Sequence, residues 1–421
     1  MPQAPYYTES THDQGAITNA SGNGVRDTAI ANTEGRLVID MADNIFVLDV
    51  KVSPFTSLLT SNGRTWDGKS LKGQALRKRM VENPTFSELE DNIGGTSTRV
   101  GAGGYSASGA LTITVGNAGS TPAYVYTPGD VVLNTRTGER MLVATVATST
   151  TITVASGGRA FGTTAAAAGL GNDTLLIIGN VNEQFAFARN VNNTRSTKID
   201  NYTQIFRQSM GASGTEQQAK LYGGPDMAHQ RAKKGIEHQR SIERAFHFGE
   251  KKSSTGTQGH PMYATGGLQE FIEASSYVQD QNGPLTAPDM EVFLREGFTY
   301  GAPEKLLECG ARVLSALSEA CRGQLQTVQG ASTYGVKIQK WVSPHGDVNI
   351  VHNPLFTDDF SGWAFLLDMD CFRYAVMNGR DTKLKTNIQA NDADGQVDEF
   401  ITECGLERVG AARCSLMKGV V

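Results

Sequence analysis

The sequence predicts an α+β protein with more than one sheet, and three observations carry this prediction. Residues 103–180 are rich in Thr, Val, Ala and Gly and contain only six charged residues, which is typical of short strands joined by turns. Residues 226–248 carry apolar side chains at helical spacing. After Gly256 helical and strand patterns alternate, which indicates helices and strands around an open sheet.

The first part of the chain, residues 1 to about 60, is predicted to be an arm with its lead-in. Residues 1–35 are polar, rich in Gly, Asn and Thr, and show no sustained periodicity, so they have little to bury in a core. The N-terminus has neither a positive start nor an apolar core, and we expect no signal peptide. Apolar residues return from Leu37 to Leu59.

Residues 64–92 divide their charge into two halves. The basic half contains Arg64, Lys69, Lys72, Arg77, Lys78 and Arg79. The acidic half contains Glu82, Glu88, Glu90 and Asp91, around the apolar Phe86, Leu89 and Ile93. A solvated loop explains this pattern, and so does a loop that reaches onto a neighbouring copy of the chain. The second interpretation predicts inter-subunit contacts at Arg77, Lys78, Arg79, Phe86, Glu88, Glu90 and Asp91.

Residues 103–180 are predicted to form a small β-domain with its own core, inserted between other elements. Val131–Leu133 and Met141–Val146 flank the turn residues Thr135–Gly138 and indicate a hairpin. Thr151–Val154 and Thr174–Ile178 are expected to add further strands.

The longest helical pattern is expected to run from Asp226 to Phe248, about 35 Å at 1.5 Å per residue. Pro225 and Asp226 suit a helix start. The apolar stripe is formed by Ala228, Ala232, Ile236, Ile242 and Phe246. The opposite face is basic through Lys233, Lys234, Arg240 and Arg244. Such a face fits a weak, salt-sensitive contact with a polyanion, and it fits a solvated surface equally well.

The C-terminal half is predicted to contain helices near 289–299 and 312–322. Strands are expected at 336–342, 348–352, 363–367 and in a long stretch from 399 to 416. The alternation of the two patterns is typical of an α+β domain.

One stretch matches a catalytic motif by its letters. GRTWDGKS at 63–70 fits the phosphate-binding pattern G-x-x-x-x-G-K-[ST]. No hydrophobic strand precedes Gly63, and Trp66 and Asp67 would turn a bulky ring and a carboxylate toward the phosphates. We interpret the match as accidental; saturable nucleotide binding that is lost in Lys69→Ala would contradict this interpretation.

The sequence predicts no catalytic, cofactor-binding or metal site. His229, His238 and His247 lie nine residues apart, so neighbours face opposite sides of a helix and cannot share a zinc ion. The five cysteines form no C-x-x-C pair and are expected to be reduced and mostly buried: Cys309, Cys321, Cys371, Cys404 and Cys414. The net charge of −5 gives no global basic field to hold nucleic acid tightly.

Four stretches of the chain, in this order, carry a family resemblance. They are NPTFSELED (83–91), GERMLV with TITVASGGRAFGTTAAAAG (138–169), LLIIGNVNEQFAFA with NYTQIFRQSMGASGTEQQA (175–219), and YGVKIQKWVSPHGDVNIVHNPLF (334–356). Together they resemble the major capsid proteins of tailed bacteriophages with the HK-97-like fold. The resemblance covers roughly residues 35–421 and is strongest to the subgroup with an inserted β-domain.

The resemblance implies an α+β HK-97-like fold with a small inserted β-barrel or β-sandwich. Its parts would be an N-terminal arm and lead-in (1–60), an extended loop (61–102), the inserted β-domain (103–180), a peripheral domain with a long spine helix (181–261), an axial domain (262–380) and a C-terminal strand returning to the peripheral domain (381–421). These boundaries are expectations from the family pattern.

The function implied is structural and not enzymatic. Pentamers and hexamers of the chain would form an icosahedral head shell around double-stranded DNA, assembled in the host bacterial cytoplasm. The implied partners are other copies, a portal protein, scaffold and decoration proteins, and packaged DNA through weak non-specific contact, with no membrane. The alternative from the same class of virion proteins is a tail-tube or decoration protein. Charge reversal at Arg77, Lys78 and Arg79 is predicted to block shell assembly and leave the subunit folded.

Overall fold

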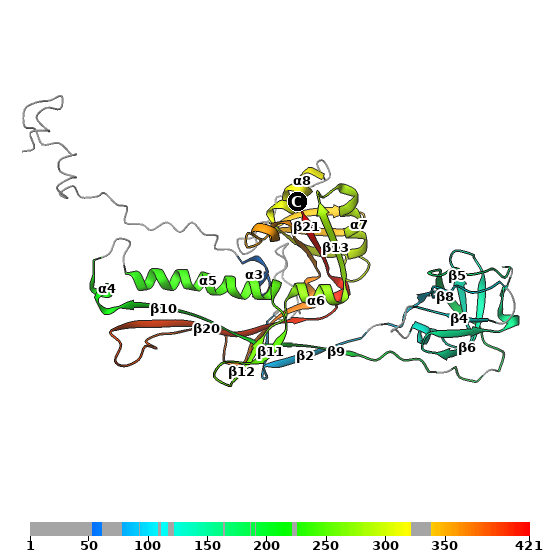
Figure 1. The fold of residues 1–421 in the computed structure, drawn as a ribbon, viewed down its shortest axis with the longest axis horizontal. Coiled ribbons are helices and arrows are strands. Elements are labelled where there is room, and N and C mark those ends of the chain that lie inside the picture. The colour runs from blue at the N-terminus through cyan, green and yellow to red at the C-terminus, as the bar shows by residue number, and fades with distance from the viewer. Residues whose placement is uncertain are drawn as a thin grey trace, which may run out of the picture. The chain divides into compact units, whose positions relative to one another are not determined.

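The computed structural model shows helices and strands in separate layers, which confirms the α+β prediction (Figure 1). It describes residues 53–60, 78–91, 93–107, 111–116, 122–162, 165–185, 187–189, 191–220, 225–320 and 338–421. The GRTWDGKS stretch, Arg77, Cys321 and nearly all of the predicted arm lie outside these residues. The described chain forms two compact units, one of residues 206–242 and 380–402, the other of residues 54–205, 243–379 and 403–421.

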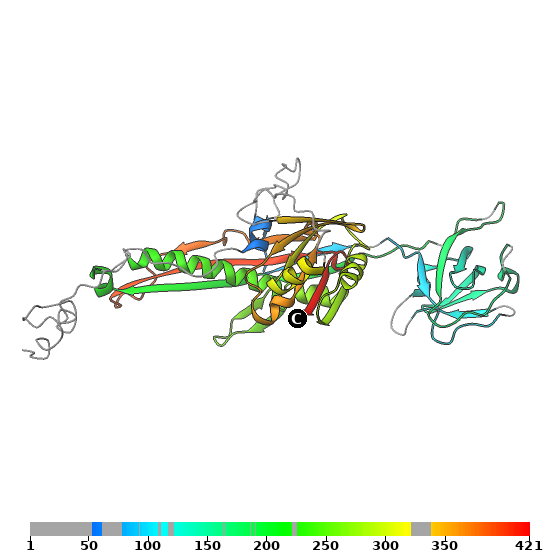
Figure 2. The same ribbon diagram turned by 90° about the horizontal axis from the view of Figure 1, so that it is seen from above.

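The first unit is built on helix α5 (Asp226–Phe248), which has the bounds predicted from its apolar stripe. Up to Ile242 the helix lies along strands β10 (Gln204–Ser213) and β20 (Gly395–Arg408), as both views show (Figures 1 and 2). Met210, Ala212 and Met227 form the core between helix and strands, with Phe400 packed against it. The short helix α4 (Gly214–Gln218) and strand β19 (Lys383–Lys385) complete the unit.

The second unit contains a six-stranded mixed sheet, called here the C-terminal sheet. Its strand order is β13 (Tyr277–Gly283), β21 (Ser415–Val420), β17 (Ala364–Leu367), β14 (Glu304–Cys309), β16 (Gly346–His352) and β15 (Ile338–Ser343). Helices α7 (Ala287–Gly297) and α8 (Ala311–Ala320) carry buried side chains into its core, among them Phe293, Leu294, Val313 and Leu317. The helices and strands predicted between 289 and 367 are therefore confirmed, with ends shifted by a few residues.

The end of the chain serves two sheets. The sequence predicts one long strand over 399–416, and the family resemblance implies that 381–421 returns to the peripheral domain as a single strand. In the structure β20 ends at Arg408, Gly410 adopts a left-handed conformation at φ 67°, and a 3₁₀ turn follows at Ala411–Arg413. β21 then pairs with β13 and β17 of the C-terminal sheet. Glycine tolerates this φ without a Cβ clash, so a break at Gly410 redirects the strand.

A second sheet of this unit joins distant parts of the chain. β1 (Lys78–Val81) pairs in parallel with β18 (Phe372–Met377), and β18 pairs with the last residues of β20. Next to it, β2 (Thr85–Glu90) and β9 (Thr197–Tyr202) form a two-stranded antiparallel ribbon. The described part of the predicted extended loop (61–102) thus pairs through β2 with the expected peripheral domain and through β1 with the expected axial domain.

Residues 97–181 form a closed sheet of their own, called here the barrel. Its strand order is β3 (Ser97–Arg99), β8 (Thr174–Asn180), β5 (Asp130–Asn134), β6 (Arg140–Thr148), β7 (Thr151–Val154) and β4 (Leu111–Thr114). A bridge between Val100 and Val115, flanked by Gly101 N–H to Thr114 O at 2.7 Å, joins the two edge strands. Closure removes the open edges. The barrel begins six residues before the predicted boundary at 103.

Smaller elements connect these sheets. They are helix α3 (Pro54–Thr60), strands β11 (Lys252–Thr255) and β12 (Pro261–Ala264), helix α6 (Leu268–Ser275), and 3₁₀ turns at Pro122–Val125, Ser156–Gly158, Asp358–Gly362 and Met369–Cys371. Among the described residues no helix has both the length and the apolar character that a bilayer crossing demands.

Candidate functional site

The residues predicted to contact a neighbouring copy are engaged within their own subunit wherever the structure describes them. Arg79 on β1 forms ion pairs with Glu88 on β2 and with Glu407 on β20, the latter at 3.0 Å. Lys78 lies over the ring of Tyr374 at 5.8 Å. Among the described residues of the segment, Arg79 of the basic half is thus paired with Glu88 of the acidic half inside one chain.

The other predicted contacts also have partners in the same chain. Phe86 is only 6% exposed and packs with Val81 and Ala375. The Glu90 carboxylate accepts the Gly410 N–H at 3.0 Å, and Asp91 accepts the Thr194 hydroxyl at 3.2 Å. A charge reversal that includes Arg79 thus breaks contacts inside the subunit, so it does not separate assembly from folding.

Large apolar side chains are exposed on the two segments that join the ribbon to the barrel. Ile93 is 99% exposed, Phe187 97% and Val191 84%, and Phe185 is fully exposed. These four residues are called here the linker set. The sequence predicts no contact role for Phe185 and Phe187. The signal for one is the pair of Phe residues among polar neighbours outside any predicted strand.

The linker that carries three of these residues is fixed to the barrel. Arg189 donates to the Asp130 carboxylate at 2.6 Å and to the Pro128 carbonyl at 3.2 Å. Asn192 donates to the Tyr124 carbonyl at 2.7 Å. Phe185 has a φ of +65°, a conformation that a residue with a bulky side chain rarely adopts. Polar bonds thus hold a segment whose apolar side chains have no partner in the described chain.

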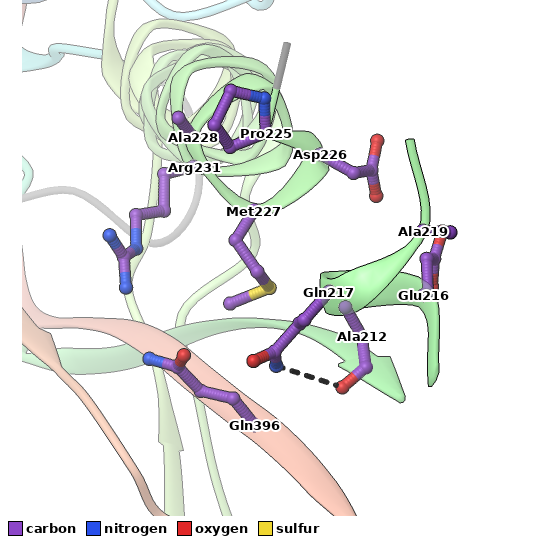
Figure 3. A pocket seen from close by; sticks show the side chains of 10 residues that line it. All are labelled: Ala212, Glu216, Gln217, Ala219, Pro225, Asp226, Met227, Ala228, Arg231 and Gln396. Carbon is purple, nitrogen blue, oxygen red and sulfur yellow. Dashed lines mark hydrogen bonds between the residues drawn. The ribbon is translucent and has the colours of Figure 1, made fainter. Parts of the chain in front are cut away.

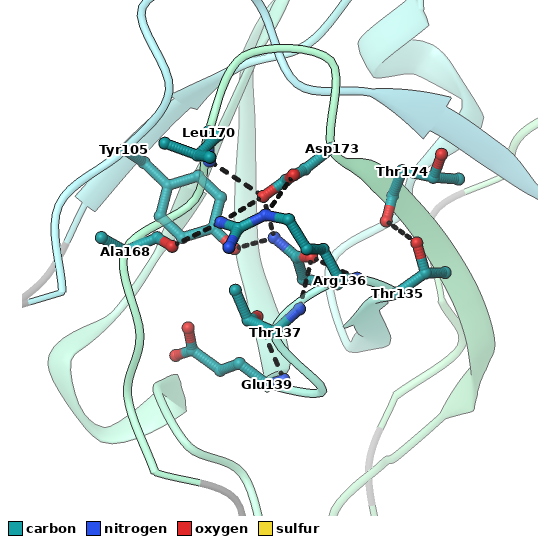
Figure 4. A network of polar contacts seen from close by, with 10 residues as sticks. Tyr105, Thr135, Arg136, Thr137, Glu139, Ala168, Leu170, Asp173 and Thr174 are labelled. Atoms are coloured by element: carbon teal, nitrogen blue, oxygen red, sulfur yellow. Dashed lines mark hydrogen bonds and ion pairs between the residues drawn. The ribbon is translucent and has the colours of Figure 1, made fainter.

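The barrel itself is locked by polar networks. Arg136, on the turn between β5 and β6, donates to Asp173 at 2.6 and 2.9 Å and to the Ala168 carbonyl at 2.9 Å (Figure 4). The Arg136 side chain, followed by the bond from Asn134, holds the pKa of Asp173 well below its usual range. Nearby, Arg159 and Glu139 form a buried bidentate pair at 2.6 and 3.0 Å. These networks hold the loops of the barrel rather than form a reactive site.

A buried cluster of Glu243, His247 and Glu308 lies in the second unit. Glu243 accepts the N–H groups of Phe55 at 2.9 Å and Thr56 at 2.7 Å, and so caps the N-terminus of α3. His247 Nδ1 donates to the Glu243 carbonyl at 2.8 Å. Its Nε2 contacts Glu308 at 2.9 Å. Asn353 donates to Glu308 at 2.7 Å.

The carboxylates of this cluster stabilise the protonated form of His247. Burial alone lowers the pKa of His247, but the charge and hydrogen bond of Glu308 outweigh burial and raise that pKa to about 9. Burial raises the pKa of Glu243 above its usual value. The three groups offer ligand atoms within 4.8 Å of one another. Their lone pairs and protons are already directed at protein partners, so the geometry fits a hydrogen-bonded anchor of α3 better than an ion site.

Glu243 and His247 stand at i and i+4 on one helix, a spacing that the sequence shows. The nine-residue spacing of the helix histidines does not reveal this pair, because its second member is a carboxylate. Glu308, the third member, follows 61 residues later on β14 and comes near only in the fold.

A pocket of about 420 Å³ lies in the first unit beside the start of α5 (Figure 3). Gln217 and Gln396 line it together with Met227 and Arg231. Arg231 is paired with Asp398 at 2.6 Å. Among the described residues of the lining, no hydroxyl, thiol or amine side chain stands beside a base.

Neither the pocket nor the buried cluster identifies a function, whereas the sequence as a whole matches a known family. The sequence matches the SU10 major capsid protein family over residues 16–420.

The chain belongs to this family.

It therefore has the role of a phage major capsid protein, a subunit of the icosahedral head shell and a component of the virion. A curated relative, the major capsid protein of Pseudomonas phage PaMx41, is 22% identical over 404 residues, covering 86% of this chain and 94% of the relative. The tail-tube and decoration alternatives are not supported by this match. For a capsid protein, the surfaces that meet other copies are the functional site.

The comparison with solved structures returns capsids at low sequence identity and with TM-scores below 0.5. The capsid of a native GTA particle is 10% identical, covers 94% of this chain and all of that chain, and gives a TM-score of 0.46. The capsid of Myoviridae phage XM1 is 10% identical, covers 91% of this chain and 97% of that chain, and gives 0.44. The family assignment rests on the sequence match.

Proposed function

We propose that this capsid protein forms pentamers and hexamers that close into the head shell, and that the linker set binds a neighbouring copy. The observation that carries this proposal is the near-complete exposure of Ile93, Phe185 and Phe187. The two Phe side chains lie on a segment that bonds from Arg189 and Asn192 fix to the barrel. A subunit that works alone gains nothing from holding two Phe side chains in water. A subunit that assembles can bury them.

The same contact would repeat at every interface between neighbouring copies. Burying a Phe or Ile side chain is worth about 1.5–3 kcal/mol. The three residues would add several kcal/mol to each contact, which offsets part of the roughly 4–15 kcal/mol lost with translational and rotational freedom. A heterologous contact, in which the linker set meets a different surface of the next copy, generates such rings.

The strained backbone at Phe185 supports the same conclusion. Left-handed φ values at residues other than glycine cost of order 1–3 kcal/mol and persist at positions where binding uses them. Here Arg189, four residues later, anchors the segment to the barrel and keeps the side chain presented.

We further propose that the barrel is an insertion carried by the extended loop. Its two ends leave adjacent strands of the ribbon, where Glu90 pairs with Thr197. The shell would enclose double-stranded DNA without gripping it, consistent with the net charge of −5. A portal protein, and scaffold or decoration proteins, would be its other partners, and assembly would occur in the host cytoplasm. The role is structural and not enzymatic.

The test compares Phe185→Ser/Phe187→Ser with the wild type. Wild-type protein at high concentration is expected to give shells or capsomers in negative-stain microscopy and fast-sedimenting species in ultracentrifugation. The double variant is expected to remain unassembled with an unchanged circular dichroism spectrum, because neither side chain has a folding partner in the described chain.

The matched control is Met262→Ser, which also removes an exposed apolar side chain, 57% exposed on β12. It should assemble like the wild type. Normal shells from the double variant would overturn the role of the linker set but not the capsid role. A wild-type protein that stays monomeric at every concentration would overturn the proposed self-assembly.

A further inference from the structure

Six threonine side chains form a regular array on the outer face of the barrel. The array has two rows, and each row crosses β4, β7 and β6. It is called here the threonine grid and consists of Thr112, Thr153 and Thr145 in one row and Thr114, Thr151 and Thr148 in the other. Neighbouring strands stand about 4.8 Å apart, and residues two apart in one strand about 6.7 Å. Hydroxyl groups therefore repeat at even intervals across three strands.

The grid faces outward because the residues between its members face inward. Ile113 on β4 and Ile152 on β7 lie in the barrel core, and successive residues of a strand point to opposite faces. On β6 the register shifts between Val146 and Thr148, which keeps Thr148 on the outer face like Thr145. The four threonines on β4 and β6 are exposed, and the two on β7 are half-buried between them.

Hydrogen bonds join hydroxyls within each row. The hydroxyls of Thr145 and Thr153 bind each other, and those of Thr148 and Thr151 do so at 2.6 Å. Each hydroxyl has one proton and two lone pairs, so a bonded pair keeps acceptor sites for a partner. The grid thus presents ordered polar groups and the methyl groups of the same side chains.

The barrel has few charged residues, and most of them are paired. A typical soluble segment of this length would contain about 20 charged residues. Residues 103–180 contain six. Five of the six form ion pairs: Arg136 with Asp173, Arg159 with Glu139, and Asp130 with Arg189. The sixth, Arg140, begins β6 and is not part of the grid. The grid is therefore an uncharged face on a barrel with little charge.

A shallow hollow of about 280 Å³ lies at the row that contains Thr112 and Thr153. Its other lining residues are apolar: Leu111, Ala144, Val154 and Ala155. The hollow and the short side chains of the grid leave room for a second sheet to approach and to bury apolar area.

A face that meets its own copy must be complementary to itself. A two-fold contact brings identical surfaces together, so charged groups near the axis would meet groups of the same sign. Threonine avoids this conflict, because its hydroxyl both donates and accepts and its methyl group is apolar. We propose that the threonine grid is a contact between two copies of this chain, in which two barrels pack face to face around a two-fold axis.

Such a contact complements the one assigned to the linker set. Heterologous contacts close rings of subunits, and a shell then needs contacts that join one ring to the next. A two-fold contact between barrels joins two rings. This role rests on the proposed assembly, whereas the contact itself does not. The grid is small compared with the roughly 800 Å² per partner of a stable complex, so the contact is weak alone and gains from the high effective concentration within a shell.

The experiment places a thiol in the grid of the full-length chain. Thr153→Cys protein is assembled at high concentration and treated with a short bis-maleimide, because packed sheets stand about 10 Å apart, too far for a direct disulfide. The expected product is a covalent dimer in denaturing electrophoresis. Mass spectrometry should find the peptide with residue 153 joined to a copy of itself.

Two controls set the background of this experiment. The wild type should give little dimer, since its described cysteines are buried. Thr135→Cys is the matched control, because Thr135 is an exposed threonine of the same barrel that lies on the turn before β6 and outside the grid. It should give no more dimer than the wild type.

Charge substitutions beside a second thiol test whether the face meets itself. In chains that carry Thr151→Cys, Thr153→Lys and Thr153→Glu each place like charges opposite one another and should lower the yield of dimer roughly tenfold. The two kinds of chain, mixed before assembly, should recover the cross-link as dimers of unlike chains. Mixing would not relieve a folding defect or an altered thiol reactivity of either variant.

The outcomes separate this contact from the proposed assembly. Shells that form without a cross-link at residue 153, or with one only to a native cysteine, would overturn the contact and leave the capsid role intact. Dimers joined through residue 153 in a protein that never forms shells would support the contact and overturn the assembly. Neither shells nor cross-links would overturn both.

Discussion

The barrel stabilises buried charge in one way, and the cluster of Glu243, His247 and Glu308, called here the α3 anchor, stabilises it in another. In the barrel, Arg159 and Glu139 lie 20 residues apart. In the α3 anchor, Glu243 binds the N–H of Phe55 from 188 residues away and His247 binds Glu308 from 61 away. Short-range partners let a segment satisfy its polar groups alone. The barrel is thus a self-sufficient part, while the anchor exists only when most of the chain has folded.

The hydrophobic cores differ in the same way. The core of the barrel comes entirely from residues between Val100 and Leu175. The core of the C-terminal sheet includes Leu285 and Val420, which lie near opposite ends of the last third of the chain. Changes in the barrel should therefore stay in the barrel, and changes in the anchor should affect the whole second unit.

His247→Ala should have the largest effect. It leaves Glu243 and Glu308 buried side by side without their cation, and it removes ring contacts of His247 with Phe55 and Phe356 at 5.1 Å each. Removing one member of a buried charge pair costs about 3–5 kcal/mol. Urea unfolding followed by tryptophan fluorescence should show this loss. An unchanged midpoint would mean that the cluster carries little stability.

Arg159→Ala should destabilise the barrel by about 3 kcal/mol, because Glu139 stays buried without its guanidinium. The loss falls toward the lower end of such values because the Ala167 N–H still donates to Glu139 at 3.0 Å. Hydrogen exchange should accelerate in residues 97–181 and stay slow in the C-terminal sheet. Faster exchange in both regions would show that the barrel is not independent.

Raising the pH should weaken the anchor and not the barrel. The pKa of His247 is about 9 in the folded protein and about 6.5 when unfolded. The stabilisation is therefore fully present below pH 6.5 and is lost as the pH rises through 9, about 3 kcal/mol in all. The raised pKa of Glu243 acts in the same direction, since its ionisation above pH 4.5 disfavours the folded state.

The pH dependence can be measured by urea unfolding from pH 6 to 10. Glu308→Gln removes the partner that raises the pKa of His247, so the fall in stability with pH should become much shallower in this variant. The same steep fall in Glu308→Gln would assign the effect to other groups.

Thr286→Ala should have the smallest effect. Thr286 and Asp289 form a capping box at the start of α7, a local contact inside the region dominated by long-range ones. Loss of an N-cap costs about 1 kcal/mol. A thermal melt should show a small shift of the midpoint. A loss as large as that of His247→Ala would mean that helix ends, rather than buried charges, control the stability of the second unit.

The sequence predicts the parts whose signal is local. α5 has the predicted bounds because its apolar stripe repeats along one helix, and β7 was placed at Thr151–Val154 by β-branched residues alone. The strand break at Gly410 was missed because one glycine between two apolar runs is a weak signal. The partition of β20 and β21 between two sheets depends on pairing, which no local pattern contains.

Contacts between residues distant in the chain cannot be predicted from the sequence either, because no local pattern records which residues meet. Arg79 carries the same charge whether it pairs with Glu407 of its own chain or with a carboxylate of another copy. The charge pattern of the sequence therefore cannot tell an intramolecular contact from an inter-subunit one. The sequence shows that the linker set is apolar. It does not show that these side chains are exposed, because that depends on whether another described element of the fold covers them.

The ribbon of β2 and β9 allows the attached domain to vary between capsid proteins without a change in the ribbon itself. Because Glu90 and Thr197 face each other across β2 and β9, the chain leaves for the barrel and returns from it at neighbouring points. A domain attached at two neighbouring strand ends can be shortened, exchanged or replaced by another domain while β2 and β9 keep their register. The same site offers an engineer a place to graft a display module onto every subunit of a particle.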